Sequence, residues 1–208
     1  MIRVNVIRAP PFLVSKQLLE TLCIKEGTIQ NLYHHQQRLD QASKDLGFTK
    51  RHTLSSLIEP PQSGCYRCRV LYDDTHISIE YLPYIKRHIS TLQALNITPF
   101  DYHLKYADRS KINHYFDQRH GADDILMIVD GLVTDTSIAN IAFFDGDRWL
   151  TPKAPLLKGT MRSRLLESHK IFEAEIPYEE IERFERFALM NAMIGFEIIK
   201  DGIILPLK

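Results

Sequence analysis

The chain has 208 residues, 44% of them hydrophobic, so it can bury a substantial core as one large domain or two small ones. Lys plus Arg and Asp plus Glu number 26 each and are scattered, so we expect no nucleic acid and no membrane as partner, but a small-molecule substrate. No stretch reaches the roughly 18 uninterrupted apolar residues of a membrane span, and the N-terminus has no signal-peptide pattern. Three cysteines cannot all pair internally, so we expect a reducing, cytoplasmic setting.

The early part of the chain predicts a strand followed by a helix. Residues 19–24 are typical of a strand, and Glu26-Gly27 of a turn. Asn31 is a plausible N-cap for a helix that Gly47 ends. The apolar face of this helix comprises Leu32, His35, Leu39, Ala42 and Leu46.

The next part predicts a hairpin and completes the first half. Residues 66–72 and 76–82, joined at Asp73-Asp74, alternate as the two strands of a hairpin. The polar stretch 87–95 predicts a short helix. We therefore expect an N-terminal α+β domain over residues 1–95.

The second half, residues 96–208, is rich in predicted strands. Residues 110–120 carry apolar side chains at helical spacing before Gly121. Strands are then predicted at 125–129, 132–134 and 138–144, with an Asp-Gly turn after the first and another after the last. A helix begins near Thr160. The whole chain is thus predicted to have an α+β fold.

Four ordered blocks contain the candidate chemical groups. They are His35-Gln-Gln-Arg38-Leu39, Lys105-Tyr-Ala-Asp108-Arg109, Gly131-Leu-Val-Thr-Asp135-Thr-Ser-Ile-Ala-Asn140, and Thr151-Pro152 with Gly159-Thr160-Met161. Spacing alone does not select them. In this order they resemble the class IV aminotransferase family, which includes branched-chain and D-amino-acid aminotransferases and aminodeoxychorismate lyase. The resemblance implies fold type IV, a homodimer, and the cofactor pyridoxal 5′-phosphate between the two halves.

The resemblance implies a phosphate site made of Arg38 and the helix that begins at Thr160 and Met161. The planar guanidinium grips phosphate with two parallel bonds, and the first N–H groups of a helix bind anions. Taken alone, Arg38 would be an ordinary solvated helix arginine, but it borders the apolar face of its helix.

The resemblance also implies that Lys105 forms the imine with the cofactor. Lys105 follows the strand-like residues 102–104 and precedes Asp108, a good N-cap for the next helix. Lys111 is the alternative, but it lies inside that helix. Asp108 replaces an asparagine that is usual in the lyase branch.

Asp135 occupies the position where the family usually has a glutamate beside the pyridine nitrogen. A carboxylate there favours the protonated ring, since an opposite charge stabilises a charged form. An exposed turn carboxylate is the alternative for Asp135 without its neighbours. Asn140 is expected to make structural hydrogen bonds.

The reaction is less strongly indicated than the family. Asn191-Ala192 resembles the lyase branch, which predicts aminodeoxychorismate lyase, forming 4-aminobenzoate and pyruvate for folate biosynthesis. The alternative is a branched-chain or D-amino-acid aminotransferase. Because family members usually have an additional N-terminal segment, a non-catalytic member is a further alternative.

Other chemistry has little support. Cys65 and Cys68 have odd spacing in a strand, so their side chains should point to opposite faces, and we predict no metal site. His34 and His35 are adjacent on a helix and cannot chelate together. No glycine-rich nucleotide loop occurs.

Overall fold

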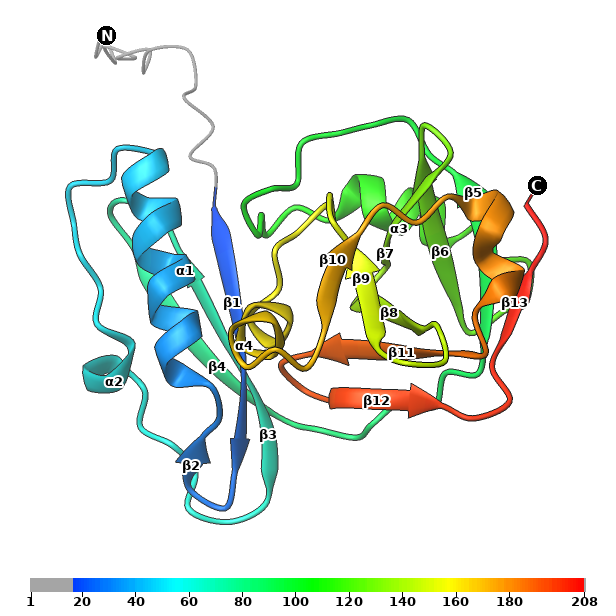
Figure 1. Ribbon diagram of the computed structural model, residues 1–208. Helices are drawn as coiled ribbons and strands as arrows, with labels where there is room; N and C mark the ends of the chain where they lie inside the picture. The colour runs from blue at the N-terminus through cyan, green and yellow to red at the C-terminus, as the bar shows by residue number, and fades with distance from the viewer. Residues whose placement is uncertain (1–16, 208) are drawn as a thin grey trace, which may run out of the picture.

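The computed structural model describes residues 17–207, and two β-sheets dominate it (Figure 1). The first sheet is antiparallel in the order β2-β1-β3-β4. Its elements are β1 (Leu18–Lys25), β2 (Thr28–Ile29), α1 (Leu32–Asp45), α2 (Leu54–Leu57), β3 (Cys65–Tyr72) and β4 (Ile77–Pro83). Alternate side chains of β1 and β3 pack against α1 in a core that includes Leu22, Leu39 and Val70. The opposite face of these two strands is turned toward the rest of the molecule.

The second sheet has nine strands, in the order β10-β9-β8-β7-β6-β5-β13, with β11 between β8 and β12. The strands are β5 (Thr91–Asn96), β6 (Asp124–Val129), β7 (Leu132–Thr136), β8 (Asn140–Phe144), β9 (Trp149–Pro152), β10 (Phe172–Ala174), β11 (Arg186–Asn191), β12 (Gly195–Ile199) and β13 (Ile203–Leu205). The helices of this part are α3 (Ser110–Phe116), α4 (Thr160–Glu167) and the 3-10 helix η1 (Tyr178–Arg183). Parallel pairs (β5–β6, β5–β13, β9–β10) and antiparallel pairs both occur, so the sheet is mixed.

α4 lies where the two parts of the molecule meet, beside α1 (Figure 1). The side-chain amide of Asn31 donates a hydrogen bond to the Thr160 carbonyl at 3.1 Å. Asn31 is the N-cap residue of α1, as predicted, but it adopts a left-handed conformation and its side chain makes no capping hydrogen bond. Its amide instead binds a helix from the other half. Gly47 does end α1 in a left-handed conformation, as predicted.

The helix predicted over residues 87–95 is wrong, because residues 91–96 form strand β5. The polar side chains that suggested a helix bind partners far along the chain. The Gln93 amide donates to the Pro206 carbonyl at 2.7 Å, and the Thr91 hydroxyl donates to the Asp123 carboxylate at 2.9 Å. The chain passes from the first sheet to the second between β4 and β5. A domain boundary near residue 95 stays a prediction.

Residues 102–104 do not form the expected strand, but the chain just after them is held at the edge of β1. The Leu19 N–H donates to the Lys105 carbonyl at 2.8 Å, and the Ala107 N–H donates to the Gln17 carbonyl at 2.8 Å. Asp108 accepts a hydrogen bond from the Ser110 N–H at 2.9 Å and so supports the start of α3, although Arg109 is the capping position. The segment that contains Lys105 is thus fixed to the first sheet.

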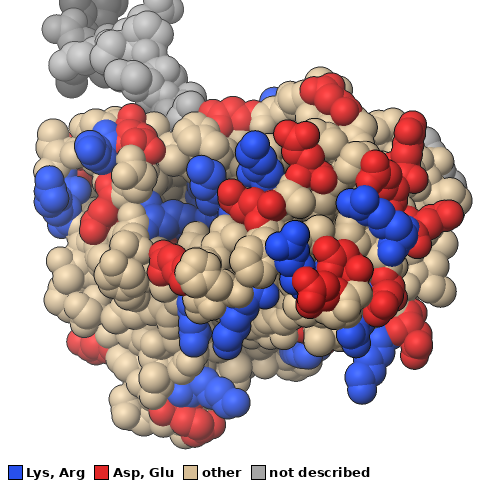
Figure 2. Space-filling model, viewed as in Figure 1, with Lys and Arg blue, Asp and Glu red and all other residues tan. Residues whose placement is uncertain are grey.

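The surface carries mixed charge. Figure 2 shows acidic and basic side chains interspersed on the viewed face. Within residues 17–207, no helix is long and apolar enough to cross a membrane.

Candidate active site

A cavity of about 380 Å³ lies between the two sheets, and it collects most of the residues singled out by the sequence. Arg38, Lys105, Asp135 and Thr160 all line it. Met161 does not, and its side chain packs on a cluster that includes Leu165 and Met190. The phosphate-binding role predicted for Met161 could therefore involve only its backbone N–H.

Lys105 reaches the cavity from the segment bound to β1. Burial lowers its pKa to about 7, and the neighbouring charges of Arg38 and Arg109 act in the same direction. Glu20 and Asp135 oppose this shift. A large fraction of Lys105 is therefore the neutral amine at neutral pH, which is the nucleophilic form.

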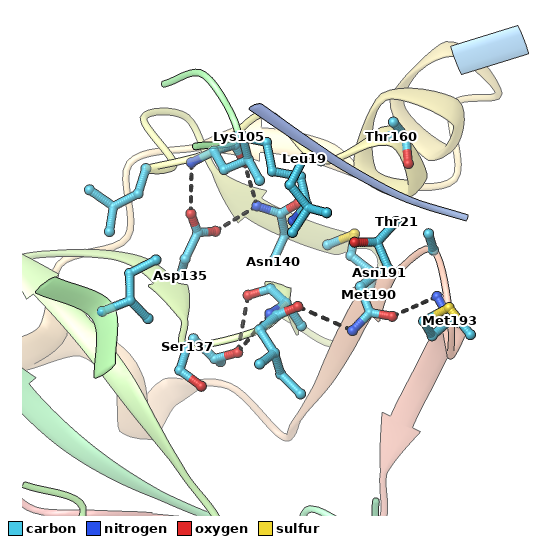
Figure 3. A pocket seen from close by; sticks show the side chains of 18 of the residues that line it. Leu19, Thr21, Lys105, Asp135, Ser137, Asn140, Thr160, Met190, Asn191 and Met193 are labelled. Atoms are coloured by element: carbon cyan, nitrogen blue, oxygen red, sulfur yellow. Dashed lines mark hydrogen bonds between the residues drawn. The ribbon is translucent and has the colours of Figure 1, made fainter. Parts of the chain in front are cut away.

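Asp135 lies near the end of β7 and is 4% exposed. Its Oδ1 accepts a hydrogen bond from the Asn140 amide at 2.6 Å, and its Oδ2 accepts one from the Leu157 N–H at 3.1 Å (Figure 3). Burial raises its pKa to about 6, although these hydrogen bonds oppose the shift. Within the described chain no Lys or Arg forms an ion pair with it, so a cation in the cavity would stabilise its charged form.

Asn140 makes structural hydrogen bonds, as predicted. Besides Asp135, its amide donates to the Leu157 carbonyl at 2.8 Å, which ties β8 to the segment before α4. Its Oδ1 lies so close to Gly159 that a Cβ there would approach it to 2.1 Å. The contact explains why glycine stands immediately before α4.

Glu20, on the α1 face of β1, binds the side chains of Arg38 and His35. Its Oε1 and Oε2 accept hydrogen bonds from Arg38 Nε and Nη2 at 2.7 and 2.6 Å, leaving Nη1 for a ligand. His35 Nδ1 lies 2.6 Å from Glu20 Oε2, and its Nε2 lies 3.3 Å from the Thr160 hydroxyl. Burial alone would raise the pKa of Glu20, but the Arg38 charge and these hydrogen bonds lower it to about 2.

This network links β1, α1 and the first turn of α4. The first N–H groups of a helix lack intrahelical partners, and the Gly159 carbonyl is engaged by the Ser163 N–H at 2.9 Å. The start of α4 and Arg38 together therefore form a set of donors suited to a phosphate. Glu20 was not among the predicted site residues. Its position in an apolar strand, on the same face as Leu18 and Leu22, is the feature of the sequence that could have indicated it.

The turn after β11 closes another side of the cavity. Asn191 Oδ1 accepts hydrogen bonds from the N–H groups of Met193 and Ile194 at 2.8 and 3.0 Å, and its amide donates to the Ile138 carbonyl at 3.1 Å (Figure 3). Asn191 thus fixes the turn shape. Ala192 and Met193 line the cavity beside it.

Three further arginines line the cavity and were not predicted: Arg67 and Arg69 on β3, and Arg109 before α3. Arg109 donates to the Ser137 carbonyl at 2.8 Å, which joins the lysine segment to the turn after β7. The alternation of β3 places Arg67 and Arg69 on one face, opposite buried Cys68 and Val70. Sequence alone did not show that this face meets the second sheet.

The alternatives to these residues lie elsewhere. Lys111 is exposed, with its amine 5.5 Å from the Phe100 ring centroid, and does not line the cavity. Cys68 is in the core of the first part while Cys65 is half-buried. Among residues 17–207 no group of three or more His, Cys, Asp or Glu side chains could hold a metal ion.

Comparisons with known proteins agree on one family for this chain. Residues 78–201 match the family model described as amino-transferase class IV. A Haemophilus influenzae protein named only "Uncharacterized protein" is 41% identical over 184 residues, covering 86% of this chain and 98% of that protein. A Schizosaccharomyces pombe protein named "Putative aminodeoxychorismate lyase" is 33% identical over 90 residues, covering 40% of this chain and 38% of that protein.

A solved structure shows the same architecture. The crystal structure of a "putative 4-amino-4-deoxychorismate lyase" from Haemophilus somnus superposes with a TM-score of 0.81 at 33% identity. The match covers 86% of this chain and 97% of that one. The two-sheet fold is therefore shared with a relative over nearly its whole length.

Proposed function

Because the chain belongs to the class IV aminotransferase family and has the two-sheet α+β arrangement of fold type IV, we propose that it is a pyridoxal-phosphate-dependent enzyme acting on an amino compound. Members of this family typically bind pyridoxal phosphate. The observation that carries the proposal is the meeting of Lys105 and Asp135 in one cavity with a set of phosphate donors.

The residues fit this cofactor in charge and in chemistry. Arg38 Nη1 and the first N–H groups of α4 would bind the phosphate. Asp135 would face the pyridine nitrogen, whose proton supplies the positive charge that this buried carboxylate lacks. Lys105, largely neutral at neutral pH, would bind the cofactor covalently.

When bound, the cofactor supplies an electron sink for the charge that develops at the substrate carbon. The side chains of this chain then have distinct tasks. Lys105 would take up the proton from that carbon as a general base, a role suited to a pKa of about 7. Asp135 would supply the negative charge that keeps a pyridine nitrogen protonated, and Arg109 keeps the lysine segment against Ser137.

Within this class, aminodeoxychorismate lyase is the reaction we propose, with 4-aminobenzoate and pyruvate as products. Support comes from the two relatives above that carry this name and from the Asn191-Ala192 turn on the cavity wall. An aminotransferase uses the same Lys105 and Asp135 and differs in the fate of the substrate. We also propose a cytoplasmic homodimer, as the family resemblance implies.

The experiment is to purify the protein with excess pyridoxal phosphate and record its visible spectrum. An absorption band retained after gel filtration is expected, and a colourless protein would favour a non-catalytic family member. The holoenzyme is then incubated with aminodeoxychorismate, and 4-aminobenzoate and pyruvate are measured. In parallel it is given branched-chain or D-amino acids with 2-oxoglutarate, and glutamate formation without lyase products would favour an aminotransferase.

A further inference from the structure

The cavity holds more positive charge than the proposed cofactor uses. Its lining includes five basic side chains and one acid, Asp135; the basic residues are Arg38, Arg67, Arg69, Lys105 and Arg109. Arg38 is bound to Glu20, and Arg109 is bound to the Ser137 carbonyl. Arg67 and Arg69 on β3 have no task in the mechanism above.

Arg67 is the least engaged of these cations. It is half-buried, and within residues 17–207 its guanidinium forms neither an ion pair nor a hydrogen bond; it lies over the Tyr84 ring, 5.3 Å from the centroid. Arg69 donates to Glu80 at 3.0 Å, but that pair is exposed and so contributes little. A half-buried, unpaired guanidinium in a cavity is suited to an anionic group of a ligand.

The strand pairing shows where this charge lies relative to Lys105. The Lys105 carbonyl is bound to the Leu19 N–H, whereas Arg67 pairs with Cys23 in the β1–β3 ladder. Leu19 and Cys23 are four residues apart on β1, so their backbones are separated by about 13 Å at roughly 3.3 Å per residue. Long side chains from both positions can converge on the two ends of a ring-sized substrate. Arg69 pairs with Thr21, between these positions.

We propose that Arg67, assisted by Arg69, binds a carboxylate of the substrate that is remote from the reacting amine. The enzyme would thereby select anionic amines in which a ring or chain separates the nitrogen from the carboxylate. This inference rests on the proposed function, since it takes Lys105 to mark the end of the cavity that holds the amine.

The test measures binding to the holoenzyme by calorimetry, with 4-aminobenzoate as the probe and aniline as the same ring without the carboxylate. We expect the wild type to prefer 4-aminobenzoate. Arg67→Gln should weaken 4-aminobenzoate binding by roughly ten- to a hundred-fold, the loss typical of a hydrogen bond to a charged group, and leave aniline binding unchanged. Arg67→Lys, which keeps the charge but not the fork, should lie between them.

Arg186→Gln is the control, because Arg186 is also a strand arginine stacked over an aromatic ring, 4.5 Å from the Phe144 centroid, but it is exposed and does not line the cavity. It should bind both probes like the wild type. The cofactor absorption band and the melting temperature report whether each variant is folded and loaded. If Arg67→Gln fails to fold, the test rests on Arg67→Lys, which should show a smaller preference for 4-aminobenzoate over aniline than the wild type.

Three results would overturn the inference. They are a wild type that does not distinguish the two probes, Arg67 variants with unchanged 4-aminobenzoate affinity, and an equal loss for aniline. Failure of the proposed lyase activity can be told apart from failure of the carboxylate site. If the protein has no lyase turnover but Arg67→Gln weakens 4-aminobenzoate binding, the carboxylate site is supported and the lyase is not. If the protein is an active lyase but Arg67→Gln changes neither its KM nor its 4-aminobenzoate affinity, the carboxylate site is excluded.

Discussion

Two titratable residues, Lys105 and Asp135, line the cavity, and burial shifts their pKa values in opposite directions. Lys105 has its pKa lowered to about 7, and Asp135 has its pKa raised to about 6. Burial disfavours the charged form of each, so a larger fraction of Lys105 is the neutral, nucleophilic amine at neutral pH, and the charged form of Asp135 would be stabilised by a cation beside it. Such paired shifts in a cavity are typical of functional sites.

Lys105→Ala should abolish covalent fixation of the cofactor by borohydride while leaving the fold intact. The side chain supplies the only proposed covalent attachment, and its removal deletes no hydrogen bond found for that amine. Mass spectrometry of the borohydride-treated protein measures the outcome. Lys111→Ala, at the exposed helix lysine, is the control and should still be fixed; fixation of cofactor in Lys105→Ala would show that another lysine is used.

Asp135→Asn should lower turnover by roughly 10²–10³-fold, the range for removing a preorganised electrostatic contact, with a much smaller effect on cofactor retention. The amide cannot supply the charge that keeps the ring nitrogen protonated. Steady-state rates and the cofactor absorption band separate the two effects. Asp135→Glu should retain measurable activity, and an asparagine variant with wild-type turnover would rule out this role.

At the scale of elements, the site depends on the junction of β1, α1 and α4. β1 brings Glu20 and holds the segment of Lys105 at its edge, α1 brings His35 and Arg38, and the second half of the chain brings α4. The side-chain network links these elements in addition to the apolar packing of α1 on β1.

Glu20→Gln should destabilise the protein by about 3 kcal/mol and weaken cofactor binding, since it leaves the largely buried Arg38 unpaired. The folded-state pKa of Glu20 lies below the usual value, so its stabilisation is fully present above about pH 4.5 and is lost as the pH falls toward about 2. The difference between wild type and variant in urea unfolding should therefore shrink over that range. Glu80→Gln, which breaks the exposed pair with Arg69, should change stability by less than about 1 kcal/mol; equal effects of the two substitutions would contradict this account.

At the scale of the whole molecule, the cavity imposes a stability cost on the cofactor-free protein. Lys105 binds its proton less tightly when folded, with a pKa of about 7 against 10.5 for the ordinary side chain. Folding is therefore penalised most below pH 7, and the penalty disappears as the pH rises to about 10.5.

Lys105→Met should accordingly raise the melting temperature of the cofactor-free protein at pH 7, by at least about 2–4 °C if 1 kcal/mol of this penalty is relieved. The gain should become smaller as the pH rises toward 10.5, since the unfolded wild type then loses the same proton. Calorimetric scans from pH 6 to 10 measure it. Lys111→Met, at an exposed site, should show no such pH-dependent gain, and a gain that is constant with pH would exclude the protonation of Lys105 as its cause.

The sequence by itself determined the strands β6, β7 and β8, and its resemblance to a family determined that family and the candidates Arg38, Lys105, Asp135 and Thr160. Local pattern was sufficient there, because alternation, turn residues and ordered blocks lie within short stretches of chain. The structure brings these four residues to one cavity. Their chemical roles stay predictions.

Only the tertiary structure decided which distant groups meet. It made residues 91–96 a strand, since that strand's partners, β6 and β13, come later in the chain. It paired Glu20 with Arg38, placed Arg67 on a cavity wall, and turned the Met161 side chain away from the cavity. The physical reason is that a strand's alternation fixes which side chains share a face, while what that face contacts depends on how two sheets pack, and packing is a non-local property of the chain.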